Sequence, residues 1–365
     1  MGSNAFANIP DELFSQDAIE YVGFSKQKAA EIWAGWVNWP PGPPREIDPH
    51  DACWPQVTFL DYIKGHANYT NDVWHDDDAA WFNCMQQKAI AIDLQQAIMD
   101  PIFKYMRMTG ICITWVRNAI DMRYRGIENI QRGVILGMAI HSCSSSRAIS
   151  AQSAPGLTIL FEAVDTARTT RLFDTQGQLD KIMDLSSPPP TDFSRNKSMY
   201  YFTTSFAVAK RYAAWVKRSA NCESVVIIKI AIRNKVIQSM SESNIQRLYW
   251  PSDDWKEFVW RCRTKKQPST ELRKYAIAAL IIGTIANNTD KNYCGFESGS
   301  QLTEDAVLKV DGPRGQQNGI QFVFSTDEEG EDLLLEAASR TIETFSFTKD
   351  DMETWIREHD NQIDS

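Results

Sequence analysis

The sequence has no excess of positive charge, which separates it from proteins that bind nucleic acids or anionic membranes. Lys and Arg together number 38 against 47 Asp and Glu, and the formal net charge is −9. Both kinds of binding depend on clustered Lys and Arg side chains that neutralise phosphate groups. We therefore expect no nucleic-acid partner and no membrane partner.

Paired cysteines and long apolar runs are also lacking. The seven cysteines are an odd number without any CxxC spacing, and several stand inside apolar runs, which favours reduced, buried thiols over a disulfide framework. The longest uncharged apolar run, 275–288, is too short to cross a bilayer, and no signal peptide is recognisable. We expect a soluble, cytoplasmic protein.

Several familiar site motifs are missing as well: phosphate-binding Gly-rich loops, zinc-ligand spacings and the GxSxG nucleophile motif. Trp74-His-Asp-Asp-Asp78 contains metal-ligand residue types, but adjacent side chains on a helix cannot all face one ion, so an acidic helix start is the better interpretation. His141-Ser-Cys143 places a base beside a nucleophile in sequence only, and we interpret this Ser-rich segment as a linker. We expect no metal.

The residues that are present fall into two parts of different character. In the first part, apolar residues recur every three or four positions, as in a helix that Ser25 can cap and that the Pro-rich segment 39–44 ends. Further helices are expected over 78–126, with interruptions at Pro101 and Gly110, and over 127–141.

The second part has short apolar runs, rich in Ile, Val, Phe and Tyr, that turn residues separate. These runs predict strands at 157–161, 199–203, 224–232, 279–286 and 319–324, with helices at 206–217, 254–261 and 329–339. The predicted fold class is α+β. We expect an all-helical domain at 1–150, a sheet domain at 151–347 and a C-terminal helical tail at 348–365.

The stretch 199–215, MYYFTTSFAVAKRYAAW, changes from strand-like to helical period within a few residues. A strand is expected to end at Thr203, and Ser205 or Thr204 can cap the helix that follows through its hydroxyl. Tyr201 then stands at the end of the strand. Taken alone, the pattern favours tyrosines that are simply packed in a core.

Four blocks in a fixed order, the first made of two segments, carry a resemblance to a known family. Asp192-Phe-Ser194 precedes Tyr201-Phe-Thr-Thr-Ser205, and Trp255-Lys-Glu257-Phe-Val259, Ile281-Ile-Gly-Thr-Ile-Ala286 and Gln321-Phe-Val-Phe-Ser-Thr326 follow. The series resembles the ADP-ribosyltransferase fold over roughly 155–345, in a fungal branch of that family. The first part has only a general likeness to fungal proteins with a GFS...A..IW..W opening. The resemblance implies a split β-sheet with NAD in the cleft between its two parts.

The resemblance also implies residue roles. Tyr201 would stack on the nicotinamide ring, Thr203 and Ser205 would lie against the bound NAD, and Glu257 would bond the nicotinamide ribose. Positive charge develops at the anomeric carbon as nicotinamide departs, and a nearby carboxylate stabilises that charge more than it stabilises the ground state. Glu257 is therefore the expected catalytic residue.

The sequence departs from the family pattern at the first strand. The family usually has Leu-Tyr-His-Gly or Leu-Tyr-Arg-Gly there, whereas this chain has Leu160-Phe-Glu162-Ala163. Arg195, or alternatively Arg168 or Arg171, could supply the missing positive charge. Glu162 could instead face water, or it could meet Glu257 across a cleft with Tyr201 between them and form an acid/base pair.

Three functions remain open from the sequence. The first is an NAD-consuming ADP-ribosyltransferase or NAD glycohydrolase, whose protein acceptor the sequence does not identify. The second is an enzyme of the same fold that converts another small-molecule substrate, for example in fungal secondary metabolism, through Glu162 and Glu257. The third is a binding protein without catalytic activity.

Overall fold

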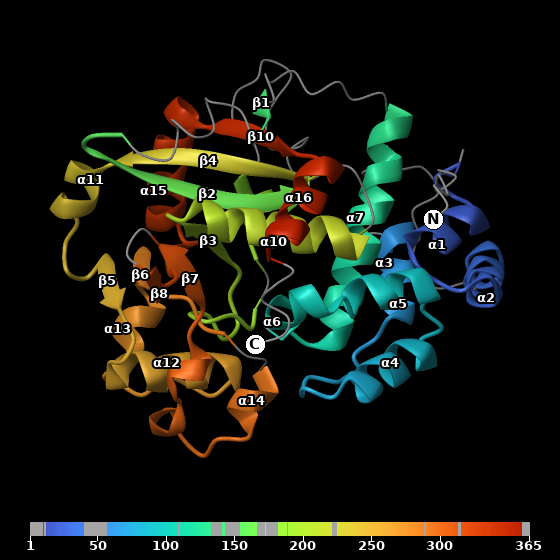
Figure 1. Cartoon of the computed structure of the whole chain (residues 1–365), viewed down its shortest axis with the longest axis horizontal. Helices are drawn as coiled ribbons and strands as arrows, with labels where there is room; N and C mark the ends of the chain where they lie inside the picture. The colour runs from blue at the N-terminus through green and yellow to red at the C-terminus, as the bar shows by residue number, and fades with distance from the viewer. Residues whose placement is uncertain are drawn as a thin grey trace.

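The computed structural model describes residues 12–39, 57–108, 110–132, 141–142, 154–165, 182–187, 189–220, 225–287, 290–312 and 315–359, together with positions 10 and 172. Helices dominate the first part of the chain, and an eight-stranded sheet with its covering helices forms the second (Figure 1). The predicted α+β fold class is therefore confirmed.

The first four helices begin where the sequence offers side-chain caps. Ser25 Oγ accepts a hydrogen bond from the Lys28 N–H at 3.3 Å, and Asp77 Oδ1 accepts from the Ala80 N–H at 3.0 Å, so the acidic segment before Asp78 opens a helix as expected. The helices are α1 (Gln16–Val22), α2 (Lys26–Val37), α3 (Phe59–His66), α4 (Asp78–Gln87), α5 (Ile92–Ile98), α6 (Lys104–Arg107) and α7 (Cys112–Arg132).

Two expectations about this part were wrong. Helix α7 continues through Gly126 to Arg132, so no separate helix starts at 127. Glycine weakens a helix interior by only about 1 kcal/mol, and burial of Ile120 and Ile127 on either side of it holds the helix together. His141–Ser142 form the short strand β1 rather than the end of a helix or a linker. The remainder of the predicted linker lies outside the described residues.

The sheet has the strand order β1-β10-β4-β2-β3-β9-β6-β5, in which the pairs β1/β10 and β5/β6 are parallel and the others antiparallel. A separate hairpin pairs β7 with β8. The strands are β2 (Leu157–Asp165), β3 (Met199–Thr203), β4 (Val225–Arg233), β5 (Ile245–Leu248), β6 (Leu280–Thr284), β7 (Lys309–Gly312), β8 (Gly315–Asn318), β9 (Ile320–Ser325) and β10 (Glu343–Phe347).

All five predicted strands are present, and four strands besides β1 were not predicted. β7 and β8 are polar and pair only with each other, β5 has four residues, and β10 follows directly on a helix. None of these has the continuous apolar run of a buried strand. The helices of this part are α10 (Phe206–Ala220), α11 (Asn234–Ser239), α12 (Asp253–Arg263), α13 (Arg273–Ala276), α14 (Asp290–Cys294), α15 (Glu328–Thr341) and α16 (Lys349–His359).

Helices cover both faces of the central strands, so β4 is buried on both sides. Val225 and Ile227 belong to the core under α10, whereas Val226 and Ile228 belong to the core under α15. Figure 1 shows α10 and α16 lying between the sheet and the N-terminal helices. One continuous core joins them, since the Trp215 ring of α10 lies 5.3 Å from the Trp115 ring of α7.

The sheet is split between β2 and β3. Nine residues of β2 pair with β4, and all five residues of β3 pair with β9. Only one residue pair, Phe161 and Thr203, joins β2 to β3. The two strands therefore part beyond this point, and the space between them is available for side chains from α10, α12 and β9.

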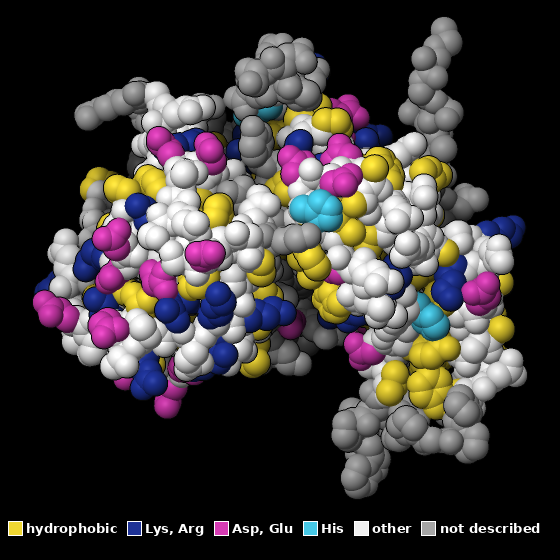
Figure 2. Space-filling model, turned by 90° about the horizontal axis from the view of Figure 1, so that it is seen from below, with side chains coloured by type: hydrophobic (Ala, Val, Ile, Leu, Met, Phe, Trp, Pro, Cys, Tyr) yellow, Lys and Arg dark blue, Asp and Glu magenta, His cyan; other side chains and the backbone are white. Residues whose placement is uncertain are grey.

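The exposed surface has no dominant sign on the face seen in Figure 2, where Lys and Arg side chains are interspersed with Asp and Glu. Among the described residues, no helix is both long and apolar enough to cross a membrane.

Candidate functional site

A cavity of about 270 Å³ lies at the split in the sheet. Strands β2 and β3, helix α10 and the segments that follow β6 and precede β3 form its walls, and α7 of the helical part adds one indole. The lining residues are Trp115, Phe161, Glu162, Ala163, Ser187, Pro190, Thr191, Asp192, Tyr201, Phe202, Thr203, Val208, Ala209, Tyr212, Arg263, Ile285, Ala286 and Gln321.

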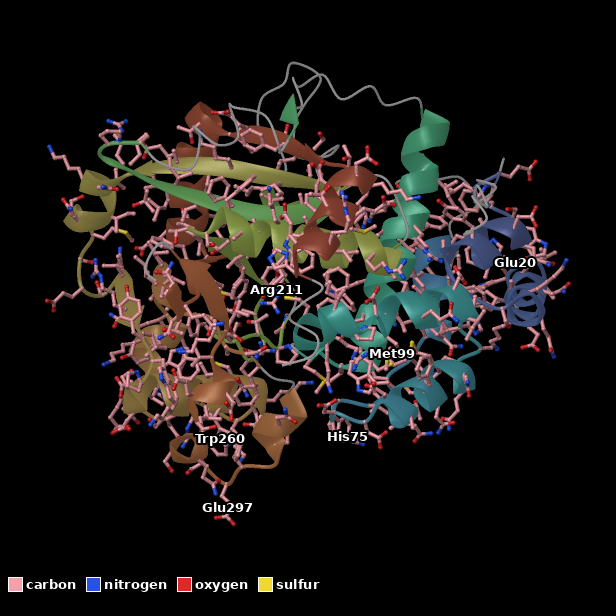
Figure 3. The ribbon with its side chains drawn as sticks, viewed as in Figure 1. Glu20, His75, Met99, Arg211, Trp260 and Glu297 are labelled. Carbon is pink, nitrogen blue, oxygen red and sulfur yellow. The ribbon has the colours of Figure 1, made fainter. Side chains whose placement is uncertain are left out.

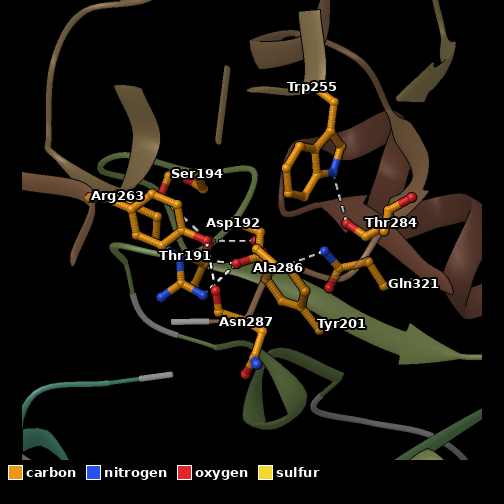
Figure 4. A network of polar contacts seen from close by, with 11 residues as sticks. Thr191, Asp192, Ser194, Tyr201, Trp255, Arg263, Thr284, Ala286, Asn287 and Gln321 are labelled. Atoms are coloured by element: carbon orange, nitrogen blue, oxygen red, sulfur yellow. Dashed lines mark hydrogen bonds and ion pairs between the residues drawn. The ribbon is translucent and has the colours of Figure 1, made fainter. Parts of the chain in front are cut away.

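Asp192 is the centre of a buried polar network in the cavity wall (Figure 4). Its Oδ1 accepts from the Arg263 guanidinium, through Nε at 2.9 Å and through Nη2. Its Oδ2 accepts from the Ala286 N–H at 2.9 Å and from the Gln321 side-chain amide at 2.8 Å. The Asp192 and Arg263 side chains are only 5% and 8% exposed, so the carboxylate is buried but neutralised and fully hydrogen-bonded.

This network joins segments that are far apart in the sequence. Asp192 belongs to the Asp-Phe-Ser segment, Arg263 ends the helix that starts with the Trp-x-Glu-Phe-Val segment, and Ala286 and Gln321 belong to the other two. The Trp255 indole N–H donates to the Thr284 carbonyl at 3.0 Å, which fixes α12 against the end of β6. The segments that carry the family resemblance therefore meet at one place.

Tyr201 lines the cavity, as expected for a residue at the end of its strand. Its hydroxyl is hydrogen-bonded to the Thr191 hydroxyl. Burial raises the pKa of Tyr201 well above its ordinary value, and the charge of Asp192 raises it further. The phenol therefore stays protonated at neutral pH, where it can donate a hydrogen bond or pack against a ring but cannot act as a base.

Tyr212 is a second aromatic wall that the sequence reasoning missed. It lies on α10, eleven residues after Tyr201, and it faces the same cavity. Burial, followed by the charge of Asp192, raises the pKa of Tyr212 to about 12. The available signal was its position in the second turn of the helix that follows β3, on the side that carries Val208 and Ala209.

Glu257 is not at the cavity, which contradicts the expectation that it would converge with Tyr201. Its Oε1 accepts from Arg261 Nε at 2.7 Å, and its Oε2 accepts from the Gly299 N–H at 3.0 Å. Six residues separate Glu257 from Arg263, so the two side chains leave α12 about 120° apart. The carboxylate instead caps a turn at 299–301, on another side of the helix.

Glu162 does line the cavity, but it is not paired with Glu257. Side chains alternate along β2, so the Glu162 side chain leaves the strand on the same side as Leu160 and Val164, toward the core under α15, whereas Tyr212 approaches the cavity from α10 on the opposite face. Its charge is one of the causes, after burial and Glu331, that raise the pKa of Tyr200 on the neighbouring strand. The predicted acid/base pair across the cleft is not found.

The three residues predicted to contact NAD beside Tyr201 have different positions. Thr203 lines the cavity, donates to the Ile320 carbonyl at 3.0 Å and accepts from the Ser205 N–H at 3.1 Å. Ser205 caps α10, because its Oγ accepts from the Val208 N–H at 3.3 Å. Arg195 is not among the lining residues in the described part of the chain.

The guanidinium at the cavity belongs to Arg263 instead, and sequence reasoning missed it because its partner stands 71 positions away. Arg168 and Arg171, the alternatives to Arg195, lie outside the described residues.

Comparisons of the chain with protein-family models, with curated proteins and with solved structures gave no match.

Proposed function

We propose that the cavity at the split in the sheet binds the nicotinamide end of NAD and that the protein cleaves the bond between nicotinamide and ribose. The observation that carries this proposal is that three of the four resembling blocks, through Asp192 and Tyr201, Ala286 and Gln321, contribute to one cavity that two tyrosines line. The block at 255–259 supports that wall through the Trp255 hydrogen bond to Thr284. A volume of about 270 Å³ suits a part of the dinucleotide, and the rest of NAD would extend out of the cavity.

The proposed reaction breaks the bond from ribose C1′ to nicotinamide N1, and the electron pair leaves with the nicotinamide. Tyr201 and Tyr212 provide flat, uncharged surfaces for the departing ring. The cation at C1′ needs a carboxylate, and we assign this role to Glu162, which among the described lining residues is the one carboxylate outside the Asp192 network. Its side chain would have to turn through the gap between β2 and β3 to reach C1′. Water then adds to C1′ with loss of a proton, which gives hydrolysis, or a nucleophilic group on a protein acceptor adds in its place.

Asp192 and Arg263 hold the cavity wall in place rather than react. The four donors to the Asp192 oxygens, together with the Arg263 charge, leave this carboxylate little capacity to stabilise a cation. Because Asp192 balances the charge of Arg263, this guanidinium attracts a pyrophosphate only weakly. The network fixes the start of the segment from Asp192 to Tyr201 and so orients Tyr201.

Release of free nicotinamide from NAD tests the proposal. Wild-type protein is expected to release nicotinamide, and Glu162→Gln is expected to lower the rate by about 100-fold or more, because a preorganised electrostatic contact to the transition state is lost. Glu257→Gln is the matched control, since the same change is made outside the cavity, and it should retain the wild-type rate. No release by wild-type protein at high concentration, or loss of activity in Glu257→Gln alone, would refute the assignment.

A binding protein without chemistry is the second candidate, and the position of Glu257 favours it over the acid/base enzyme. The acid/base mechanism requires two carboxylates in one pocket, whereas Glu257 is outside the cavity and Asp192 is neutralised. An aromatic cavity alone is sufficient to bind a flat small molecule. Quenching of tryptophan fluorescence by nicotinamide or NAD, without any nicotinamide release, would support this candidate.

We also propose that the protein acts in the cytoplasm. Cys84, Cys112 and Cys262 are buried and free, as expected in a reducing compartment. Cell fractionation, followed by immunodetection of the protein, tests this assignment: the protein should be found in the cytosolic fraction rather than in membrane-enclosed compartments.

A further inference from the structure

A second cluster of reactive side chains lies in the helical part, outside the cavity. Asp72 precedes α4, Cys84 is in α4, and Cys112 is the first residue of α7. One carboxylate oxygen and the two sulfur atoms all lie within 4.8 Å of one another. Both cysteines are buried, and Asp72 is half-buried. Figure 3 marks this part of the molecule by His75, before α4, and Met99, after α5.

The two oxygens of Asp72 have different surroundings. Its Oδ1 accepts hydrogen bonds from the Val73 N–H at 2.7 Å and the Ile113 N–H at 3.0 Å, so it caps the first turn of α7. Its Oδ2 is buried, and no described residue donates a hydrogen bond to it. A buried carboxylate oxygen without a donor is costly, so a bound group that satisfies it would stabilise the fold.

The spacing of the three side chains suits a small thiolate-binding cation. Zinc binds sulfur at about 2.3 Å and carboxylate oxygen at about 2.0 to 2.2 Å in a tetrahedral arrangement, which requires neighbouring ligand atoms to be about 3.5 to 3.8 Å apart. The observed atoms lie within 4.8 Å of one another, so each needs to move by only about 1 Å to reach these distances. Thiolate with carboxylate is a ligand set that zinc accepts.

The charges around the cluster also suit a cation with anionic ligands. Two thiolates and one carboxylate around Zn²⁺ have a net charge of −1. The positive charge of Lys88 acts on Asp72 and Cys84, and that of Arg107 acts on Cys112. Arg107 is itself fixed, since it donates to Asp78 Oδ1 at 2.6 Å and to the Met99 carbonyl at 3.3 Å.

We propose that Asp72, Cys84 and Cys112 bind one Zn²⁺, with water as the fourth ligand. Binding releases the two thiol protons to solvent and forms two Zn–S bonds and one Zn–O bond. The metal would tie the loop before α4, the middle of α4 and the start of α7 together. Helix α7 carries Trp115, a cavity wall residue whose indole N–H donates to the Arg107 carbonyl at 2.7 Å, so the same metal would stabilise one side of the cavity.

The test uses the full chain, purified under reducing conditions, stripped with a chelator and reloaded with zinc. Wild-type protein is expected to retain one zinc per chain after gel filtration, and Cys84→Ser and Cys112→Ser are expected to retain none. Cys262→Ser is the matched control, because it changes another buried thiol, on α12, and it should still bind one zinc. Zinc should raise the thermal unfolding midpoint of wild type and of Cys262→Ser only.

Cobalt loading of the wild type keeps the proposal testable even where a cysteine variant fails to fold. If both Cys84 and Cys112 bind the metal, the thiolate-to-cobalt absorption of the wild type should have twice the intensity that a single thiolate ligand gives. Absence of zinc and cobalt binding by reduced wild-type protein overturns the proposal, and so does full zinc uptake by the Cys84→Ser/Cys112→Ser double variant. A Cys84–Cys112 disulfide that forms in place of metal binding, with no metal uptake after reduction, overturns it as well. These readouts do not depend on nicotinamide release.

Discussion

Substitution of Arg263 by Met removes the guanidinium from the Asp192 network while keeping much of the apolar length of the side chain. Asp192 would retain the Ala286 N–H and the Gln321 amide as donors, but it would lose its only counter-charge within that network. Both side chains are less than a tenth exposed, so water cannot easily replace the guanidinium.

The expected magnitude follows from this burial. Removal of one partner of a buried ion pair generally destabilises a protein by about 3 to 5 kcal/mol, because an uncompensated charge stays inside. Lys197→Met is the control, since the Lys197 and Asp327 side chains are 51% and 57% exposed, and loss of that pair should cost only about 0 to 1 kcal/mol. Since the whole free energy of unfolding of a domain is about 5 to 15 kcal/mol, the two variants should differ clearly.

Urea unfolding, followed by tryptophan fluorescence, measures the free energies of unfolding of wild type and both variants. The Asp192→Asn/Arg263→Met double variant completes a thermodynamic cycle and is expected to be less destabilised than the sum of the two single variants, by about 0.5 to 3 kcal/mol. Equal effects of Arg263→Met and Lys197→Met, or strict additivity in the cycle, would refute the view that this ion pair holds the cavity wall together.

Two further predictions concern packing and pH. Gly283→Ala should destabilise the protein by about 1 to 3 kcal/mol, because a Cβ there would lie 2.4 Å from the Leu248 carbonyl oxygen and 2.6 Å from the Phe193 ring. Gly126→Ala in α7, where a Cβ would meet no atom within 4 Å, should stabilise the protein by about 0.5 to 1 kcal/mol. Urea unfolding measures both free energies of unfolding. Burial raises the pKa of Asp72 from 3.8 to about 6, so the metal-free native state binds more protons than the unfolded state in this interval. The stability of metal-free wild type relative to Asp72→Asn should therefore fall as the pH rises from 3.8 to about 6 and stay constant above it; a difference that rises over this interval would contradict the assignment.

The sequence predicted those elements whose pattern is set locally. Strand β4 is a run of apolar residues, apart from Lys229 and the terminal Arg233, because helices cover it on both faces, and Ser205 caps α10 directly after β3. The hairpin of β7 and β8 has no such run, since its strands pair only with each other. Patterns of burial therefore identified the central sheet but not the elements at its margin.

The site was harder to predict than the sheet, and α12 shows why. Glu257 and Arg263 both stand among aromatic and apolar residues on the same helix, so the sequence offers the same reason to place either of them in a cavity. The choice depends on partners that are distant in the chain: Gly299 holds Glu257, whereas Asp192 draws Arg263 inward. Tyr201 was predictable because the strand that positions it is local.

The division between wall and ligand residues decides how any loss of activity is interpreted. Asp192, Arg263 and Gln321 have their polar atoms engaged with one another, so their substitution would reduce activity through a displaced wall even if none of them touches a ligand. Glu162 and Tyr212 are lining residues of the same cavity that do not belong to this network. A variant of either that keeps the wild-type free energy of unfolding but loses nicotinamide release would therefore report on the chemistry, whereas the same loss in Asp192→Asn would not.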